Sequence, residues 1–162
     1  MEKNKEFNGR SLRSIISNAC EEYLYPIQNL NEMDTGLILY TNNRKLINKF
    51  SKSKKKIKEI YQITLKQPLA LKDFKKIKKL FLEEEINHKK GVITYVKDDT
   101  KMNKIGIETY IGEIEKIKNL FGVIKCELTL DRVFFAGLTK KDLPRKKFRH
   151  LTQEEINLLM RI

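Results

Sequence analysis

The stretch LYPIQNLNEMDTGLILYTNN, residues 24–43, has the layout of a strand, a polar loop and a second strand. Residues 36–41 are a nearly continuous apolar run, which predicts a strand at the centre of a sheet with residues 23–30 as its partner. Enzymes often place a catalytic side chain on a loop of this kind. This loop nevertheless offers the amides Asn29 and Asn31 where chemistry would want a charge.

The rest of the chain shows the periodicities of strands and helices. Residues 58–66 alternate, with Tyr61, Ile63 and Leu65 expected on the buried side. Apolar residues at helical spacing predict an amphipathic helix over 71–84, with lysines on its opposite face. Further helices are predicted over 11–22, 43–50, 113–123 and after Thr152, and further strands over 91–97, 104–110 and 124–135. The lack of strict βαβ order indicates an α+β fold with a mostly antiparallel sheet.

Length and composition favour one globular domain. The chain has 162 residues, of which 40% are apolar, enough for a genuine core. Residues 1–10 are polar and are expected to form a disordered tail, which leaves 11–162 as a single domain. No apolar run could span a bilayer, and the N-terminus lacks the apolar core of a secretory signal. We therefore expect a cytoplasmic protein in which Cys20 and Cys126 are reduced core residues.

The net charge of +13 favours a polyanionic partner, most often nucleic acid. A second interpretation stays open, because the basic residues are mostly lysine and the chain is rich in Ile and Asn. Such a composition also follows from an AT-rich genome. Charge alone therefore does not decide whether the protein binds RNA.

Signatures of the common cofactor, metal and hydrolase sites are absent from the sequence. The seven glycines are scattered and form no phosphate-binding loop. The two histidines and two cysteines have the spacing of neither a zinc site nor a His-based triad. The sequence therefore predicts no metal and no cofactor.

One longer pattern does match a known family. The pattern G-R-L-D-x-x-T-x-G-L-L-L-L-T-N-D-G is matched in one unbroken register by Leu30, Gly36, Leu37, Leu39, Thr41 and Asn42. Tyr25 and Pro26 match the Tyr-Pro pair that usually precedes it. The segment resembles the ribosomal RNA pseudouridine synthases of the bacterial small- and large-subunit type.

Three later segments extend this resemblance over residues 9–160. Residues 58–64 resemble the family's K-x-Y strand, and residues 112–121 (GEIEKIKNLF) resemble its G-R-N-R-Q-V-R-R-M-F helix. Residues 130–159 resemble its closing segment nearly residue for residue. The resemblance implies a pseudouridine synthase-like fold, a mixed and mostly antiparallel sheet flanked by helices. The family's usual N-terminal RNA-binding domain has no counterpart in this sequence.

The resemblance also implies a catalytic carboxylate that this chain lacks. In the family, the Asp of G-R-L-D attacks the nucleotide or removes a sugar proton, and the neighbouring Arg is its ion-pair partner. The Asp position is Asn31 here and the Arg position is Asn29. An amide is neutral and barely basic, so neither role is open to Asn31. Tyr61 falls on the family's active-site tyrosine, although a strand tyrosine is equally often an ordinary core residue.

Other carboxylates near the loop do not restore the pattern. Asp34 lies three residues after Asn31, up to roughly 10 Å of extended chain, and is interpreted as a turn or cap residue. Glu113 and Glu115 replace two arginines of the family's helix, a repulsive change where RNA phosphates would pass. The joint loss of Asp and Arg indicates abandoned chemistry, because two neighbouring amides can satisfy one another.

Basic residues remain where the resemblance implies phosphate contact. The predicted RNA-binding residues are Lys54, Lys55, Lys56, Lys58, Lys116, Arg132, Lys140, Lys141, Arg145, Lys146, Lys147 and Arg149. An ordinary solvated surface is the alternative interpretation of both lysine-rich clusters.

These observations predict a monomeric, catalytically impaired pseudouridine synthase relative that binds ribosomal RNA or a ribosomal subunit. An active isomerase that uses a non-standard carboxylate is the first alternative. A module that binds an acidic protein, or a decaying remnant without a task, is the second.

Overall fold

A computed structural model describes residues 6–7, 10–31, 33–53, 56–83, 91–96 and 99–162. The strands are β1 (Glu6–Phe7), β2 (Arg10–Ser11), β3 (Tyr25–Ile27), β4 (Thr35–Gly36), β5 (Leu39–Thr41), β6 (Lys58–Leu65), β7 (Val92–Tyr95), β8 (Lys104–Tyr110), β9 (Leu128–Phe135) and β10 (Leu138–Thr139). The helices are α1 (Leu12–Ile16), α2 (Arg44–Lys52), α3 (Leu71–Glu83), α4 (Ile114–Gly122) and α5 (Gln153–Arg161). The predicted tail, residues 1–10, falls largely outside the described residues, as do Lys54 and Lys55.

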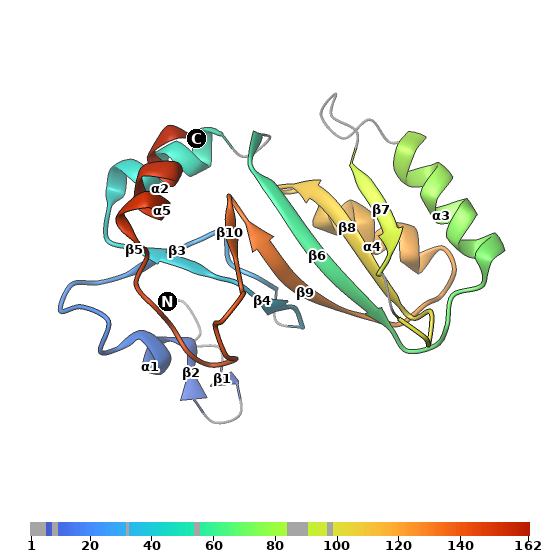
Figure 1. Ribbon diagram of the computed structural model, residues 1–162, viewed down its shortest axis with the longest axis horizontal. Coiled ribbons are helices and arrows are strands. Elements are labelled where there is room, and N and C mark those ends of the chain that lie inside the picture. The colour runs from blue at the N-terminus through green and yellow to red at the C-terminus, as the bar shows by residue number, and fades with distance from the viewer. Residues whose placement is uncertain (1–5, 8–9, 32, 54–55, 84–90, 97–98) are drawn as a thin grey trace.

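A sheet in the strand order β10-β9-β6-β8-β7 forms the middle of the elongated molecule (Figure 1). Neighbours along this order are antiparallel, and the short strand β4 joins β9 in parallel. Helices flank the sheet, so the α+β class with a mostly antiparallel sheet is confirmed. No helix in the described ranges is both long and apolar enough to cross a bilayer.

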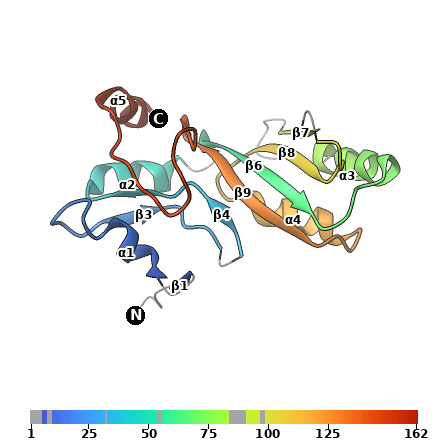
Figure 2. The ribbon, with the colours of Figure 1, turned by 60° about the horizontal axis from the view of Figure 1, so that its bottom comes forward.

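The alternation of β6 decides which side of the sheet faces the core. Tyr61, Ile63 and Leu65 are at most 2% exposed, as the sequence predicts. They share one buried cluster with residues of α3 and α4, namely Ile77, Phe81, Ile117 and Phe121. Burial of these large side chains is the main force that holds the helices on the sheet (Figure 2).

A second group of elements packs at the other end of the molecule. Leu46 and Phe50 of α2 meet Leu159 of α5 in a separate buried cluster. The side chain of Asn43 caps α2, and Thr152 forms a capping box at the start of α5. The predicted helices in these two places are confirmed.

The predicted pairing of the 36–41 run with the strand at 23–30 is confirmed by β5 and β3, but the predicted extent and central position of the run are wrong. Gly36 has a φ of 119°, and the chain turns there instead of continuing straight. The residues before the turn pair with β9, and the residues after it form β5, which pairs only with β3 among the described strands. The apolar run is therefore divided between two sheets, because Leu39 packs in the second cluster.

Two other predicted elements are shorter than expected. The helix over 11–22 ends at Ile16, and Cys20 is exposed instead of lying in the core. The strand over 124–135 begins at Leu128, because the chain makes a turn with a positive φ at Lys125. Cys126 lies beside that turn and is half-buried.

Candidate functional site

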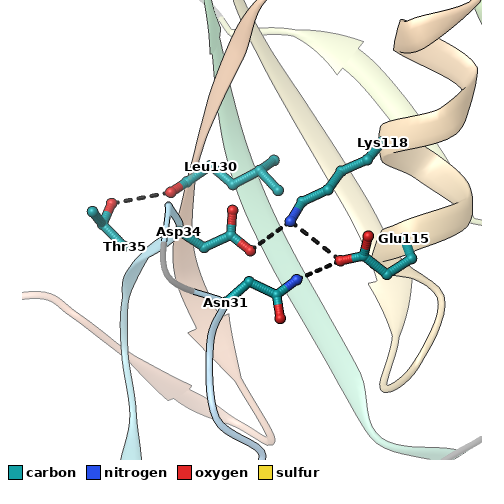
Figure 3. Close-up of polar contacts among 6 residues, drawn as sticks. All are labelled: Asn31, Asp34, Thr35, Glu115, Lys118 and Leu130. Atoms are coloured by element: carbon teal, nitrogen blue, oxygen red, sulfur yellow. Dashed lines mark hydrogen bonds and ion pairs between the residues drawn. The ribbon is translucent and has the colours of Figure 1, made fainter. Parts of the chain in front are cut away.

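The loop of residues 28–37 follows β3 and includes the short strand β4. A tight turn forms its tip. The amide of Asp34 donates to the carbonyl oxygen of Asn31 at 3.0 Å. The turn brings the side chains of Asn31 and Asp34 to the same helix, α4 (Figure 3). Asp34 therefore lies in a turn, as the sequence analysis expects, and the turn places its side chain near that of Asn31.

Four side chains form one polar network at this tip. The amide of Asn31 donates to Glu115 Oε1 at 2.5 Å. The ammonium of Lys118 donates to Asp34 Oδ2 at 2.8 Å and to Glu115 Oε1 at 3.2 Å. Figure 3 shows both loop side chains pointing toward α4. Asn31 thus acts as a hydrogen-bond donor to an anion, a role that an ionised aspartate could not fill.

This arrangement corrects the interpretation of the paired amides. Asn31 donates to Glu115, and the described residues show no hydrogen bond between Asn31 and Asn29, which is exposed. The acidic residue on α4 is therefore the partner of the amide. Positions 31 and 115 both differ from the pattern of the resemblance. Their side chains contact each other directly.

Lys118 is an ion-pair partner of both carboxylates of the tip, Asp34 and Glu115. The Asp34 side chain is 6% exposed and the Lys118 side chain is 22% exposed, so their ion pair is largely shielded from water. Burial alone would lower the pKa of Lys118, but hydrogen bonds to Asp34 and Glu115 raise it above its ordinary value. Lys118 therefore stays charged at neutral pH. The one signal that could have pointed to this residue is its place one helical turn after Glu115.

Arg132 holds the two ends of the loop from inside the protein. Its guanidinium donates to the carbonyl oxygens of Leu37 at 2.6 and 2.8 Å and of Gln28 at 3.0 Å, and to Glu59 Oε1 at 2.9 Å. The side chain is 0% exposed, and it also lies 4.3 Å from the ring centre of Phe135. This burial and these partners favour a structural role for Arg132 over the expected contact with RNA phosphate.

Tyr61 lies next to this buried pair. It is 2% exposed and packs in the same cluster as Leu30 of the loop. Burial raises the pKa of its hydroxyl above the ordinary range, and the charge of Glu59 adds to that effect. Burial also raises the pKa of Glu59, although Arg132 opposes the shift. With the loop in this position, the Tyr61 ring is covered by the protein.

A pocket of about 1070 Å³ lies on the outer side of the loop. Asn31 and Asp34 line it, and Tyr61 is not among the lining residues. The basic segment is defined here as Lys140, Lys141, Arg145, Lys146, Lys147 and Arg149, and all of these except Lys141 also line the pocket. The structure therefore brings Asn31 together with most of one predicted RNA-binding cluster but not with Tyr61.

Half of the basic segment is engaged within the protein. Lys140 and Arg145 both bind Asp131, the latter at 3.1 Å, and Arg149 makes two hydrogen bonds to Glu155. The bond from Arg149 lowers the pKa of Glu155 to about 2. The remaining residues, Lys141, Lys146 and Lys147, are exposed. Of these three, Lys146 and Lys147 line the pocket, whereas Lys141 does not.

The other predicted RNA-binding residues lie apart from the pocket. Lys58 pairs with Glu108 at 2.6 Å, and Lys116 pairs with Glu113 at 2.9 Å. Lys56 is exposed. No group of three or more metal-ligating side chains occurs among the residues that the structure describes.

Comparison with known proteins identifies the family. Residues 2–132 match the family described as RNA pseudouridylate synthase. The fold is similar to a solved structure described as the crystal structure of pseudouridylate synthase, with a TM-score of 0.69 and 18% identity over 92% of this chain. The chain spans 65% of that protein's length. No curated protein matches the chain. The chain belongs to the RNA pseudouridylate synthase family.

Proposed function

We propose that this protein is a cytoplasmic, monomeric member of its family that binds structured ribosomal RNA and has little or no isomerase activity. One observation carries the proposal. The side chain at the position of the family's catalytic aspartate is an amide, and that amide donates a 2.5 Å hydrogen bond to Glu115. The site is therefore built around a neutral donor instead of a nucleophile or base.

The chemistry follows from this substitution. Pseudouridine formation in the family needs an anionic oxygen that attacks the nucleotide or accepts a sugar proton. Asn31 has no such oxygen, and its partner Glu115 is held by hydrogen bonds from Asn31 and Lys118. Loss of a catalytic nucleophile lowers the rate by about 10⁴- to 10⁶-fold. RNA binding does not depend on that carboxylate, because it rests on cations near phosphates.

The pocket supports the binding half of the proposal. Lys146 and Lys147 line it and are exposed, and Lys141 is exposed on the same basic segment. The amide of Asn31 and the wall of the pocket offer hydrogen bonds to a base or a sugar, while these lysines suit the phosphates.

A tritium-release assay on ribosomal RNA labelled at uridine C5 tests the catalytic half. We expect no release above the background given by a denatured sample of the same protein. A sample of an active family member provides the positive control. Release that rises with protein concentration and time would overturn the proposal.

One observation favours a second candidate function, an isomerase that uses Asp34. Asp34 stands in the same network as Asn31 and forms a 2.8 Å pair with Lys118, which is a carboxylate–cation pair of the kind that the family's mechanism requires. In this case Asp34→Asn would abolish the release of tritium. Asp73→Asn, which removes a carboxylate on α3, would leave it unchanged and is the matched control.

Salt-dependent binding to ribosomal RNA helix fragments tests the binding half. A protein that binds through phosphates loses affinity steeply as salt rises, with about one unit of log–log slope for each contact. We expect a Lys141→Gln/Lys146→Gln/Lys147→Gln variant to reduce that slope by about three. If the log–log salt slope of the natural sequence is near zero, RNA binding is ruled out. The remaining alternatives are then a module that binds an acidic protein and a remnant without a function.

A further inference from the structure

A face of α3 carries four exposed lysines that the site described above does not use. Lys72, Lys75, Lys76 and Lys79 follow the spacing i, i+3, i+4 and i+7, so they share one side of the helix. All four are exposed. We call this set the α3 lysine face.

The helix that carries this face is fixed firmly to the sheet. Ile77 and Phe81, on its opposite side, are 0% and 2% exposed. Phe74 stacks on Tyr95 of β7 with ring centres 4.2 Å apart, and the Tyr95 hydroxyl donates to the Leu69 carbonyl at 3.0 Å just before the helix begins. The lysines therefore stand on a rigid support and point away from the core.

Few acidic groups offset the charge of the face. Lys79 lies 3.7 Å from Glu83, and the other three lysines have no ion pair within the part of the chain that the structure describes. Like charges three and four residues apart repel one another and weaken a helix. A polyanion that binds along the face would remove this repulsion.

The face lies far from the pocket along the molecule. Figures 1 and 2 place α3 at one end of the sheet, whereas α1, α2 and α5, which surround the pocket, lie at the other end. A short RNA stem-loop seated in the pocket would not extend to α3. A longer RNA that follows the sheet would reach both.

We propose that the α3 lysine face is a second contact for the phosphate backbone of the same RNA, used only by targets long enough to span the molecule. This inference rests on the proposed RNA-binding function and extends it. Lys72 and Lys79 are about 10 Å apart along the helix axis, so the face spans more than one phosphate. Lysine is depleted in the core of protein–protein interfaces but is a common partner of phosphate, so the face suits RNA better than a protein.

Binding to two RNAs tests the inference. One is a short ribosomal RNA hairpin, and the other is the same hairpin with its stem extended. The variant is Lys72→Gln/Lys75→Gln/Lys76→Gln, and the matched control, with equal loss of charge, is Lys45→Gln/Lys101→Gln/Lys125→Gln, whose lysines are exposed elsewhere. Circular dichroism would check that both variants fold.

For the extended RNA, we expect the variant of the face to lower the log–log salt slope by about three, one for each lysine removed. For the short hairpin, we expect the slope of that variant to equal the slope of the natural sequence. The control variant should leave both slopes unchanged.

Two negative results have different meanings. If the natural sequence binds with a steep slope but the face variant behaves like the control on the extended RNA, only this inference is wrong. If the natural sequence binds neither RNA with a measurable salt slope, the proposed function itself fails, and the face is open to an acidic protein.

Discussion

The base and the tip of the 28–37 loop are both held by charged side chains, but in different surroundings. At the base, the Arg132–Glu59 pair is 0% and 1% exposed and binds the carbonyls of Gln28 and Leu37. At the tip, the Asn31–Glu115 contact lies in a network whose Glu115 side chain is 61% exposed. The base is enclosed by the core, whereas the tip borders the pocket.

This difference shows which part of the loop is free to change. Removing one partner of a buried pair leaves an uncompensated charge, so the base is coupled to folding. An exposed contact contributes little to stability, because water replaces it. The exposed Asn31–Glu115 contact can therefore change without loss of the fold. That freedom explains how a family member can carry an amide at position 31 and keep the family's architecture.

The largest expected effect is at the base, for Arg132→Met. Glu59 would then be buried without its cation, and two backbone carbonyls would lose their donor. We expect a loss of about 3–5 kcal/mol in the free energy of unfolding, measured by urea denaturation. The double variant with Glu59→Met should recover much of this loss. A single variant as stable as the natural sequence would remove the contrast between base and tip.

The second prediction concerns the backbone at the base, for Gly36→Ala. A Cβ atom at this position would lie 2.3 Å from the backbone nitrogen of Arg132. The φ of 119° is also a backbone conformation that residues with a side chain rarely adopt. We expect a loss of about 2–4 kcal/mol by the same measurement. Gly122→Ala is the matched control, because a Cβ there meets nothing within 4 Å. Equal stability of the two variants would contradict the close packing at Gly36.

The third prediction concerns the tip, for Asn31→Asp. The new carboxylate would face Glu115 across the present 2.5 Å contact and would replace a hydrogen bond with repulsion. We expect a cost of about 1–2 kcal/mol, smaller than at the base because water screens the site. Adding Glu115→Gln should recover most of it. If the two substitutions have independent effects on stability, Asn31 and Glu115 are not coupled.

Asn31→Asp and Glu115→Gln, combined with Asn29→Arg, also test the proposed loss of isomerase activity. Restoring the family pattern with Asn31→Asp and Asn29→Arg should give more tritium release when Glu115→Gln is also present. The reason is that Glu115 would otherwise oppose ionisation of the new aspartate.

The smallest expected effect is the pH dependence of the tip. The pKa of Lys118 is raised in the folded protein, so its contribution is present below the ordinary value of 10.5 and is lost as pH rises through the higher folded value. We expect Lys118→Met to cost about 1–2 kcal/mol at neutral pH, because the shielded Asp34 carboxylate loses its cation. Urea denaturation at increasing pH should show this difference shrinking only above pH 10.5. A difference that disappears near neutral pH would contradict the charged network.

Strictly alternating and helical segments were predictable from the sequence. The buried side of β6, the helix α3 and the capped helix α5 follow from local spacing, because burial of every second residue or of one helical face leaves a repeating pattern. The division of the 36–41 run between two sheets was not predictable from the sequence. Gly36 divides it through a contact with Arg132, which lies 96 positions later in the sequence.

The site was predictable in its identities but not in its contacts. The sequence by itself determined that an amide stands at the aspartate position and that cations follow in the closing segment. Only the tertiary structure decided that Glu115 and Lys118 hold the loop tip, that Arg132 is internal, and that Asn31 faces the pocket while Tyr61 does not. Residue types fix what chemistry is possible. Which residues meet depends on packing between segments far apart in the chain, and no local pattern records that.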